Sequence, residues 1–255
     1  MVITSRKNDA VKRFRELLRE KSARDAQGVF AVEGDHLCGE LAKSGYGIIS
    51  VLATERAEEK YPQTAALLRQ KCSDVTVISG DVAEYISDTK APQGLFAVAE
   101  KPVSHGISGA RRLVLLDGVQ DPGNVGTIIR TAEALGFGGA VLSPDCADIW
   151  APKTLRASMG SVLRLPCVIG SMQEQVRALR ADGFSVYGAM LNESAARLGE
   201  IEFPERAAVV IGSEGRGVSP AVAAECTRAV YIPISGAESL NAAAAAAIIL
   251  WELSK

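Results

Sequence analysis

The polar residues of this chain that could do chemistry gather in three loops, each of which follows an apolar, strand-like run. The three segments span residues 115–137, 209–219 and 232–250. Each has an apolar run, then a loop rich in Gly, Pro, Asn and Ser, and then a helix-like run. Loops at strand ends are where α/β folds bind ligands. Three such loops in one domain therefore predict one composite pocket.

The first loop combines a turn with an arginine on the following helix. The sequence from Asp121 to Asn124 (DPGN) is strong turn chemistry directly after an apolar run. The free N–H groups at the start of the next helix suit an anion. Arg130 lies about two turns into that helix and could project back toward the loop. The segment is neither a dinucleotide fingerprint nor a P-loop. A capped turn with an exposed arginine is the alternative.

The other two loops carry a carboxylate and a Ser–Asn pair. Residues 212–217 (GSEGRG) place three glycines around Glu214, and glycines let the backbone bend sharply and approach a ligand closely. The alternative for this loop is a flexible turn with a surface carboxylate. In the third segment, Ser239 and Asn241 stand at the start of the final helix. Either residue is also a natural N-cap, so capping alone is the alternative there.

Alternating strands and helices must position these loops. In the first part of the chain, strand-like and helix-like runs alternate, which indicates a small α/β layer fold. The strands expected there are residues 29–33, 48–53, 75–78 and 95–100.

In the second part of the chain, the strands are continuous apolar runs. Such runs predict a parallel sheet that is covered on both faces. Between the two parts, residues 101–111 have the Pro, Gly and Ser content of a linker. The predicted domains are therefore residues 1–103 and 112–255, joined by a linker at 104–111.

The composition is that of an ordinary globular protein, with 47% hydrophobic and 23% charged residues among 255. The five cysteines form no C-x-x-C pair and the only histidines are His36 and His105, so we expect no metal site. Reduced thiols and the lack of a signal peptide or membrane span predict a cytoplasmic protein. Residues 1–24 hold eight basic and three acidic side chains. They form either a solvated amphipathic helix or a contact with phosphates.

Taken together, the three segments resemble the SpoU–TrmH family of RNA ribose 2′-O-methyltransferases. In that family the first loop carries an asparagine and the following helix a catalytic arginine, and Asn124 and Arg130 match both at the right spacing. The family pattern G-x-E-G-x-G fits residues 212–217, and its S-L-N signature fits Ser239 and Asn241. Many relatives continue with Val-Ser, whereas six alanines follow here. We expect this departure to alter helix packing and not the chemistry.

The resemblance implies a fold and a cofactor. The second domain would be a SPOUT methyltransferase domain, a parallel α/β sheet tied in a deep trefoil knot. S-adenosylmethionine would bind among its loops, and the domain would form a homodimer with the site near the subunit interface. The expected cofactor contacts are Gly212, Ile232 and Leu240.

The resemblance extends, more loosely, to the N-terminal part. Residues 30–45 and 87–100 resemble the family's small substrate-binding domain, which is related to ribosomal RNA-binding proteins. This likeness favours RNA over a small molecule as the methyl acceptor, and ribosomal RNA in particular. No membrane partner and no metal are expected.

The implied reaction is attack of a ribose 2′-oxygen on the methyl carbon of S-adenosylmethionine. Relatives are often described with the arginine as general base, but a guanidinium does not normally deprotonate. We therefore expect Arg130 to bind the adjacent phosphate and to stabilise the developing alkoxide, with the proton passing to phosphate or water. The catalytic residues that the resemblance implies are Asn124, Arg130, Glu214, Ser239 and Asn241.

Three other interpretations stay open at this point. The acceptor could be transfer RNA, or the chain could be an RNA-binding relative without catalysis, which need not bind S-adenosylmethionine. A hydrolase that uses Ser213 or Ser239 would need a histidine partner. Both histidines, His36 and His105, precede the second predicted domain, which disfavours that reaction.

Overall fold

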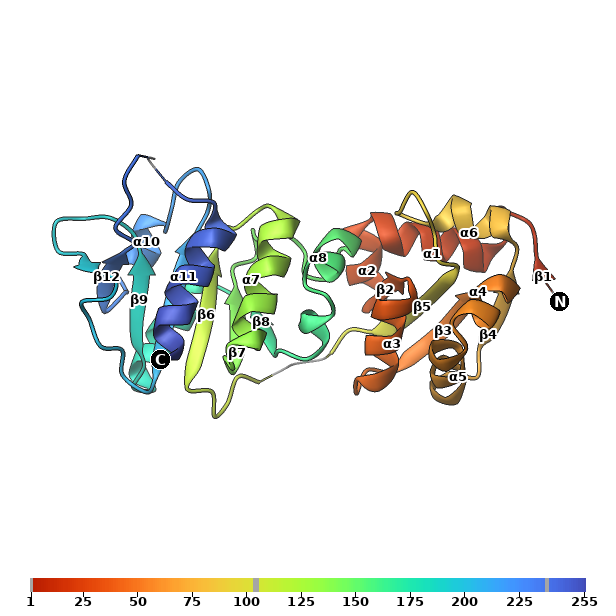
Figure 1. Ribbon diagram of the computed structural model, residues 1–255, viewed down its shortest axis with the longest axis horizontal. Helices are drawn as coiled ribbons and strands as arrows, with labels where there is room; N and C mark the ends of the chain where they lie inside the picture. Colours follow the sequence, from red (N-terminus) through yellow and green to blue (C-terminus); the bar gives the residue numbers. More distant parts are fainter. Residues whose placement is uncertain (1, 103–105, 237–238) are drawn as a thin grey trace. The chain divides into compact units, whose positions relative to one another are not determined.

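The computed structural model describes residues 2–102, 106–236 and 239–255, and the chain divides into two compact units (Figure 1). Unit 1 comprises Met1–Val103 and Trp150–Leu163, and unit 2 comprises Ser104–Ile149 and Arg164–Lys255. The segment Trp150–Leu163 thus packs with the first unit, although its position in the sequence falls inside the second predicted domain. His105 and part of the predicted linker lie outside the described residues.

Unit 1 is built on a five-stranded sheet of order β1-β4-β3-β5-β2. Strands β1, β4 and β3 are parallel, and β5 pairs antiparallel with β3 and with β2. All five residues of β2 are buried, as its continuous apolar run predicts. The strands are β1 (Val2–Ile3), β2 (Val29–Glu33), β3 (Ile48–Ala53), β4 (Val75–Ile78) and β5 (Leu95–Glu100).

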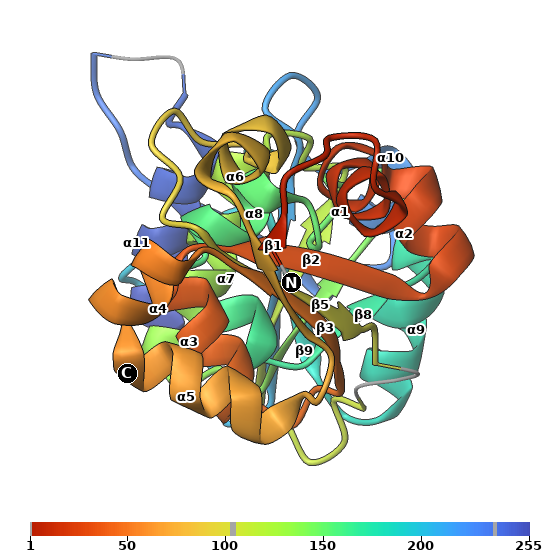
Figure 2. The ribbon, with the colours of Figure 1, turned by 90° about the vertical axis from the view of Figure 1, so that its right-hand side faces the viewer.

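Helices cover both faces of this sheet (Figure 2). On one face, α1 and α6 bury apolar side chains against alternate residues of the strands, such as Phe14 of α1 against Phe96 of β5 at 5.4 Å between ring centroids. On the other face, α3 and α5 pack together. The helices are α1 (Asp9–Arg19), α2 (Lys21–Gln27), α3 (Asp35–Lys43), α4 (Glu55–Lys60), α5 (Pro62–Lys71) and α6 (Gly80–Ile86).

The segment Trp150–Leu163 completes unit 1 with helix α8 (Pro152–Ala157) and a short 3-10 turn. The Trp150 ring stacks on Phe30 of β2, with centroids 4.4 Å apart. Leu155 of α8 is fully buried. Burial of one such side chain is worth about 1.5 to 3 kcal/mol. The segment is therefore held in unit 1 by apolar packing.

Unit 2 is built on a seven-stranded sheet of order β10-β12-β9-β11-β6-β7-β8, in which every pairing is parallel. The predicted parallel sheet of this part is confirmed. The strands are β6 (Arg112–Asp117), β7 (Gly139–Leu142), β8 (Cys167–Ile169), β9 (Ser185–Ala189), β10 (Ala196–Arg197), β11 (Ala207–Gly212) and β12 (Arg228–Tyr231).

Helices cover this sheet too. Helices α7 and α11 lie side by side (Figure 1); α7 packs on β6 and β7, and α11 packs on β6 and β11. Helix α9 packs on β6, β7 and β9 through Met172, Val176 and Leu179. The helices are α7 (Pro122–Ala134), α9 (Met172–Ala181), α10 (Pro220–Ala223) and α11 (Ala242–Ser254).

Across the described part of the chain, no helix combines the length and apolar character that a membrane span requires. Within the same ranges, no group of His, Cys, Asp and Glu side chains is arranged to hold a metal ion. The cysteines are free thiols.

Candidate active site

The three loops that the sequence singled out follow β6, β11 and β12 in unit 2. Because all strands of this sheet are parallel, the carboxyl ends of these three strands lie at the same edge. That edge is where open parallel sheets bind ligands. The fold therefore brings together loops that lie far apart in the sequence.

Three predicted site residues, one from each loop, are joined by hydrogen bonds. Asn124 Nδ2 donates to Glu214 Oε1 at 2.6 Å, and Asn241 Nδ2 donates to Asn124 Oδ1 at 3.1 Å. The Asn124 amide is thus fixed at both ends, donating from one and accepting at the other. We call Asn124, Glu214 and Asn241 the polar trio.

Helix caps hold the polar trio in place. Asp121 is the N-cap of α7, and its Oδ1 accepts from the backbone N–H of Asn124 at 2.9 Å. Asn241 is the N-cap of α11, and its Oδ1 accepts from the backbone N–H groups of Ala243 and Ala244 at 2.9 and 3.2 Å. This capping turns the Asn241 amide NH2 toward Asn124. The sequence left open whether Asn241 caps the helix or belongs to the site. In the structure it does both, because it caps α11 and donates to Asn124.

The loop that carries Glu214 is closed by its own backbone. Ser213 and Gly217 exchange backbone hydrogen bonds of 3.1 and 2.9 Å, and Gly217 has φ of 68°. A Cβ atom on Gly212 would lie 2.0 Å from the carbonyl carbon of Gly217. Only glycine fits at position 212, so its first role is this close backbone approach.

Asp117 is a residue of this edge that the sequence analysis did not single out. It ends β6, is 9% exposed, and its Oδ2 accepts from the backbone N–H of Ser219 at 2.7 Å. This bond fastens the far end of the Glu214 loop to the neighbouring strand. An acidic residue closing an otherwise apolar run was the available signal, because a buried carboxylate needs a partner.

Two of the three predicted cofactor contacts share a cavity. Ile232 and Leu240 line a space of 160 Å³ together with Met190, Tyr231 and Ile249. Its walls are mainly apolar, which fits the aromatic part of a nucleoside cofactor. As formed by the described residues, the space is smaller than the roughly 300 Å³ at which ligand pockets begin. Gly212 does not line this cavity.

Arg130 is not hydrogen-bonded to the polar trio. It is exposed on α7 and lines a separate hollow of 420 Å³ with Thr127, Ala247 and Trp251. Within the described residues its guanidinium makes no hydrogen bond or ion pair. Six positions along a helix turn a side chain by about 240° relative to the first. Arg130 therefore lies on another side of α7 than Asn124.

Ser239 precedes the cavity residue Leu240 and is exposed. Its side chain makes no hydrogen bond to any described residue. Of the five predicted catalytic residues, the structure joins three directly. Ser239 stands next in sequence to Leu240, which lines the cavity, and Arg130 lines the hollow between α7 and α11.

The thiols of unit 2 are poor nucleophiles. Burial raises the pKa of Cys226 to about 11 and that of Cys167 to about 12. Burial also raises the pKa of Cys146, whose Sγ donates to the Leu116 carbonyl at 3.2 Å. Since the thiolate is the reactive form, these groups do not suit covalent catalysis. The described residues of unit 2 contain no histidine to activate a serine.

Two family models match the chain. Residues 111–251 match the SpoU rRNA Methylase family, and residues 8–97 match the MRM3-like substrate binding domain. The first match covers the sheet of unit 2 with all three loops. The second falls within unit 1.

Relatives match along nearly the whole length. The chain is 36% identical to the 23S rRNA (guanosine(2553)-2′-O)-methyltransferase RlmP of Bacillus subtilis, over 98% of both chains. It is 31% identical to the 23S rRNA (uridine(2479)-2′-O)-methyltransferase of Streptomyces viridochromogenes, over 98% of this chain and 90% of that one. The AdoMet-bound rRNA methyltransferase of Sinorhizobium meliloti superposes with a TM-score of 0.88 at 30% identity, covering 99% and 97% of the two chains.

Proposed function

Because this chain belongs to the SpoU rRNA methylase family, we propose that it methylates a ribose 2′-hydroxyl of 23S ribosomal RNA with S-adenosylmethionine as donor. The observation that carries this proposal is the polar trio, in which three loops at one sheet edge are joined by hydrogen bonds. An RNA-binding relative without catalysis would have no need to keep that arrangement. Two relatives that span both units are named for 23S rRNA, which favours it over transfer RNA.

The cofactor would lie at the cavity after β12. Ile232 and Leu240 would contact its aromatic part, and the backbone of the loop at Gly212 would line the approach from the polar trio. Bound there, S-adenosylmethionine supplies a methyl group that its sulfonium already makes electrophilic. The protein then has to position the ribose oxygen and handle its proton.

In this reaction Arg130 would act through its positive charge and not as a general base. A guanidinium stays protonated, and its planar fork suits a phosphate next to the reacting ribose. It would hold that phosphate and stabilise the developing alkoxide, while the proton leaves to phosphate or water. The amide of Asn124, fixed by Glu214 and Asn241, would orient the acceptor nucleotide. Ser239 would hydrogen-bond at the entrance to the cofactor cavity.

The position of Arg130 supports a homodimer through unit 2. The hollow it lines is bordered by α11, where Trp251 is 58% and Ile248 is 43% exposed. Small Ala247 beside these large apolar side chains permits close packing of another helix. A second copy on this face would bury the apolar side chains and bring the unpaired arginine of one protomer to the subunit interface.

The fold of unit 2 would include the trefoil knot, and the protein would work in the cytoplasm where ribosomal RNA is. Support for the knot comes from the end of the chain. The last helix, α11, packs on β6, β11 and α7, whereas the strand before it, β12, pairs with β9 and β10. The C-terminal segment therefore returns across the sheet after β12.

The test is methyl transfer from labelled S-adenosylmethionine to 23S rRNA by the full chain, with the ribose position mapped by reverse transcription. We expect one labelled nucleotide, and no label when the 2′-hydroxyl at that nucleotide is replaced by hydrogen. Binding of S-adenosylmethionine without transfer to any RNA would favour a non-catalytic relative. Label in transfer RNA alone would reassign the substrate.

A further inference from the structure

Unit 1 contains a cavity whose lining residues all belong to that unit. Its volume is 320 Å³, within the roughly 300 to 1,000 Å³ typical of ligand pockets. It lies between α8 with the turn that follows it, the start of α3, and the loop that precedes β5. Its walls are mostly apolar with a few polar side chains. The lining residues that matter are His36, Leu37, Ala91, Gln93, Arg156 and Met159.

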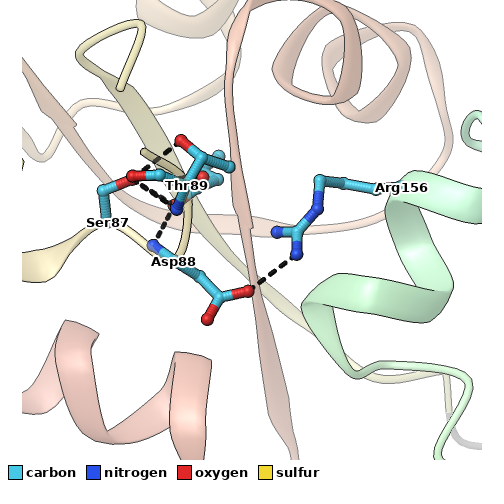
Figure 3. A network of polar contacts seen from close by, with 5 residues as sticks. Ser87, Asp88, Thr89 and Arg156 are labelled. Atoms are coloured by element: carbon cyan, nitrogen blue, oxygen red, sulfur yellow. Dashed lines mark hydrogen bonds and ion pairs between the residues drawn. The ribbon is translucent and has the colours of Figure 1, made fainter. Parts of the chain in front are cut away.

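Arg156 lines this cavity, and only one of its two terminal nitrogens is known to have a hydrogen-bond partner. It reaches from α8 to Asp88, where Nη2 donates to Oδ2 at 2.7 Å (Figure 3). Nη1 is shielded from water and has no hydrogen-bond partner among the described residues. A shielded donor without a partner is unfavourable until an acceptor reaches it. A ligand that brings an acceptor atom into the cavity would be stabilised at this position.

Gln93 offers a second donor in a fixed orientation. Its Oε1 accepts from the backbone N–H of Asp35 at 2.7 Å, so its Nε2 is the end that is left to donate. In the described part of the chain nothing accepts from that group. A Cβ on Gly34, which has φ of 91°, would lie 2.7 Å from the same Oε1. The absence of a side chain at Gly34 therefore makes space for the Gln93 side-chain amide.

Met159 forms an apolar rim beside these donors. Its φ of 49° lies in the left-handed region that residues other than glycine rarely adopt, and its side chain is 42% exposed. His36 Nε2 donates to the Met159 carbonyl at 3.2 Å, which helps to hold this backbone. With Leu37 and Ala91, the thioether provides a polarisable wall of the kind that packs on aromatic rings.

We propose that this cavity binds one unstacked nucleobase of the substrate RNA, with a preference for guanine. The proposal rests on the proposed function for its RNA substrate. Guanine presents two adjacent acceptors, O6 and N7, on one edge, and Arg156 and Gln93 supply two donors. The base face would pack on Met159. Proteins read RNA sequence mainly at such splayed, unstacked bases.

A phosphate group suits the cavity less well than a neutral base. The buried Glu33 carboxylate accepts from Ser87 Oγ at 3.2 Å and from the Asp88 backbone N–H at 2.9 Å. The Asp88 carboxylate faces Arg156. Two carboxylates beside one guanidinium leave a net negative charge, which repels an anion.

The experiment measures binding of the full chain to short, labelled uridine oligomers that carry a single central guanosine, adenosine or uridine. Gln93→Glu keeps the oxygen that faces Asp35 and replaces the donor by an acceptor. Arg156→Lys keeps the charge that faces Asp88 and removes the second donor. The matched controls are Gln70→Glu and Arg69→Lys, which make the same changes at exposed positions of α5. Thermal melts check that each variant folds.

We expect the native chain and both controls to prefer the guanosine oligomer by at least about tenfold, and both pocket variants to lose that preference without a change in salt dependence. Equal affinity of the native chain for the three oligomers would overturn the proposal, as would a preference that survives in both pocket variants. A uniform loss of affinity with a shallower salt dependence would assign the cavity to a phosphate instead.

A second measurement does not depend on substitutions. An oligomer with a central 6-thioguanosine, crosslinked by light to the native chain, should label peptides that contain His36, Gln93 or Met159. Labelling confined to unit 2 would contradict the proposal. Methyl transfer to 23S rRNA, measured in parallel, separates the two ideas. Intact transfer without guanosine preference rejects only the nucleobase pocket, whereas absent transfer to any RNA rejects the proposed function.

Discussion

Asn124 and Asn241 are 117 residues apart in the chain, yet the side-chain amide of one donates to that of the other at 3.1 Å. The bond joins the first turn of α7 to the cap of α11. It is the longest-range link in the polar trio, and it allows the capping role of Asn241 to be separated from its role in the site.

Asn241→Asp should keep the cap and lose the link to Asn124. An aspartate still accepts from the N–H groups of Ala243 and Ala244, so the melting temperature should stay close to that of the native chain. Methyl transfer should fall by about tenfold or more, because the amide of Asn124 loses one of its two partners. Asn241→Ala should lose both the helix cap and the hydrogen bond to Asn124, and its free energy of unfolding should fall by about 1 kcal/mol. Equal activities of the native chain and Asn241→Asp would show that capping is its whole contribution.

Arg130→Ala should leave S-adenosylmethionine affinity nearly unchanged and reduce methyl transfer by at least about a hundredfold, as is typical when one oxyanion-stabilising contact is removed. Calorimetric titration and a transfer assay measure the two effects. The control is Arg197→Ala, at an arginine of unit 2 whose partner is Glu200. Near-normal turnover of Arg130→Ala would reject the assignment.

Gly212→Ala should destabilise unit 2. The added Cβ would lie 2.0 Å from the Gly217 carbonyl carbon, and the backbone there has to shift. Overpacking of this kind costs about 1 to 3 kcal/mol, which corresponds to several degrees in melting temperature. Gly215→Ala in the same loop meets nothing within 4 Å and is the matched control. A similar melting temperature for both variants would show that the loop adapts freely.

Trp251→Glu should disrupt the proposed dimer. The ring is 58% exposed beside Arg130, so a carboxylate there should not unfold the monomer. Sedimentation should change from dimer to monomer, and methyl transfer should fall in parallel. Ile169→Glu, at a 54% exposed residue of the edge strand β8, is the control. A native chain that sediments as a monomer would remove the basis for this prediction.

Cys226 should react slowly with iodoacetamide in the folded protein. Burial raises its pKa to about 11, so at pH 8 only about 0.1% is thiolate, against roughly a quarter for an ordinary cysteine. Mass spectrometry should find alkylation at least about a hundredfold slower than in urea. Because the folded-state pKa is the higher one, this thiol favours folding below about pH 8.5 and that contribution is lost as the pH rises toward 11. Fast alkylation at pH 8 would show that the site opens readily.

Local pattern was sufficient for much of the fold. The strands Val29–Glu33, Ile48–Ala53, Val75–Ile78 and Leu95–Glu100 have the predicted bounds because each is an apolar run between polar or turn residues. The spacing of the apolar residues Val11, Phe14, Leu17 and Leu18 predicts a single helix over residues 9–22. The structure has two helices there, because Glu20 adopts an extended φ and ψ between them. A break at a single residue does not change the spacing of the apolar side chains, so that spacing could not predict it.

Packing between distant segments was harder to predict. The apolar residues around Trp150 indicate burial, but no periodicity says which sheet covers them, so stacking on Phe30 could not be read from sequence. In the site, Asn124, Glu214 and Asn241 were found because polar side chains in loops after apolar strands are conspicuous. The surroundings of Arg130 could not be predicted in the same way, because they include Ala247 and Trp251 of α11, a helix that is distant in the sequence.

The polypeptide crosses between the two units three times, after residues 103, 149 and 163. Neither unit is therefore encoded by one uninterrupted stretch of gene. A fragment that begins near residue 104 would leave Trp150 and Leu155 without their covering partners and would be prone to aggregate. The roles of the two units are for this reason better separated by single substitutions than by cutting the chain.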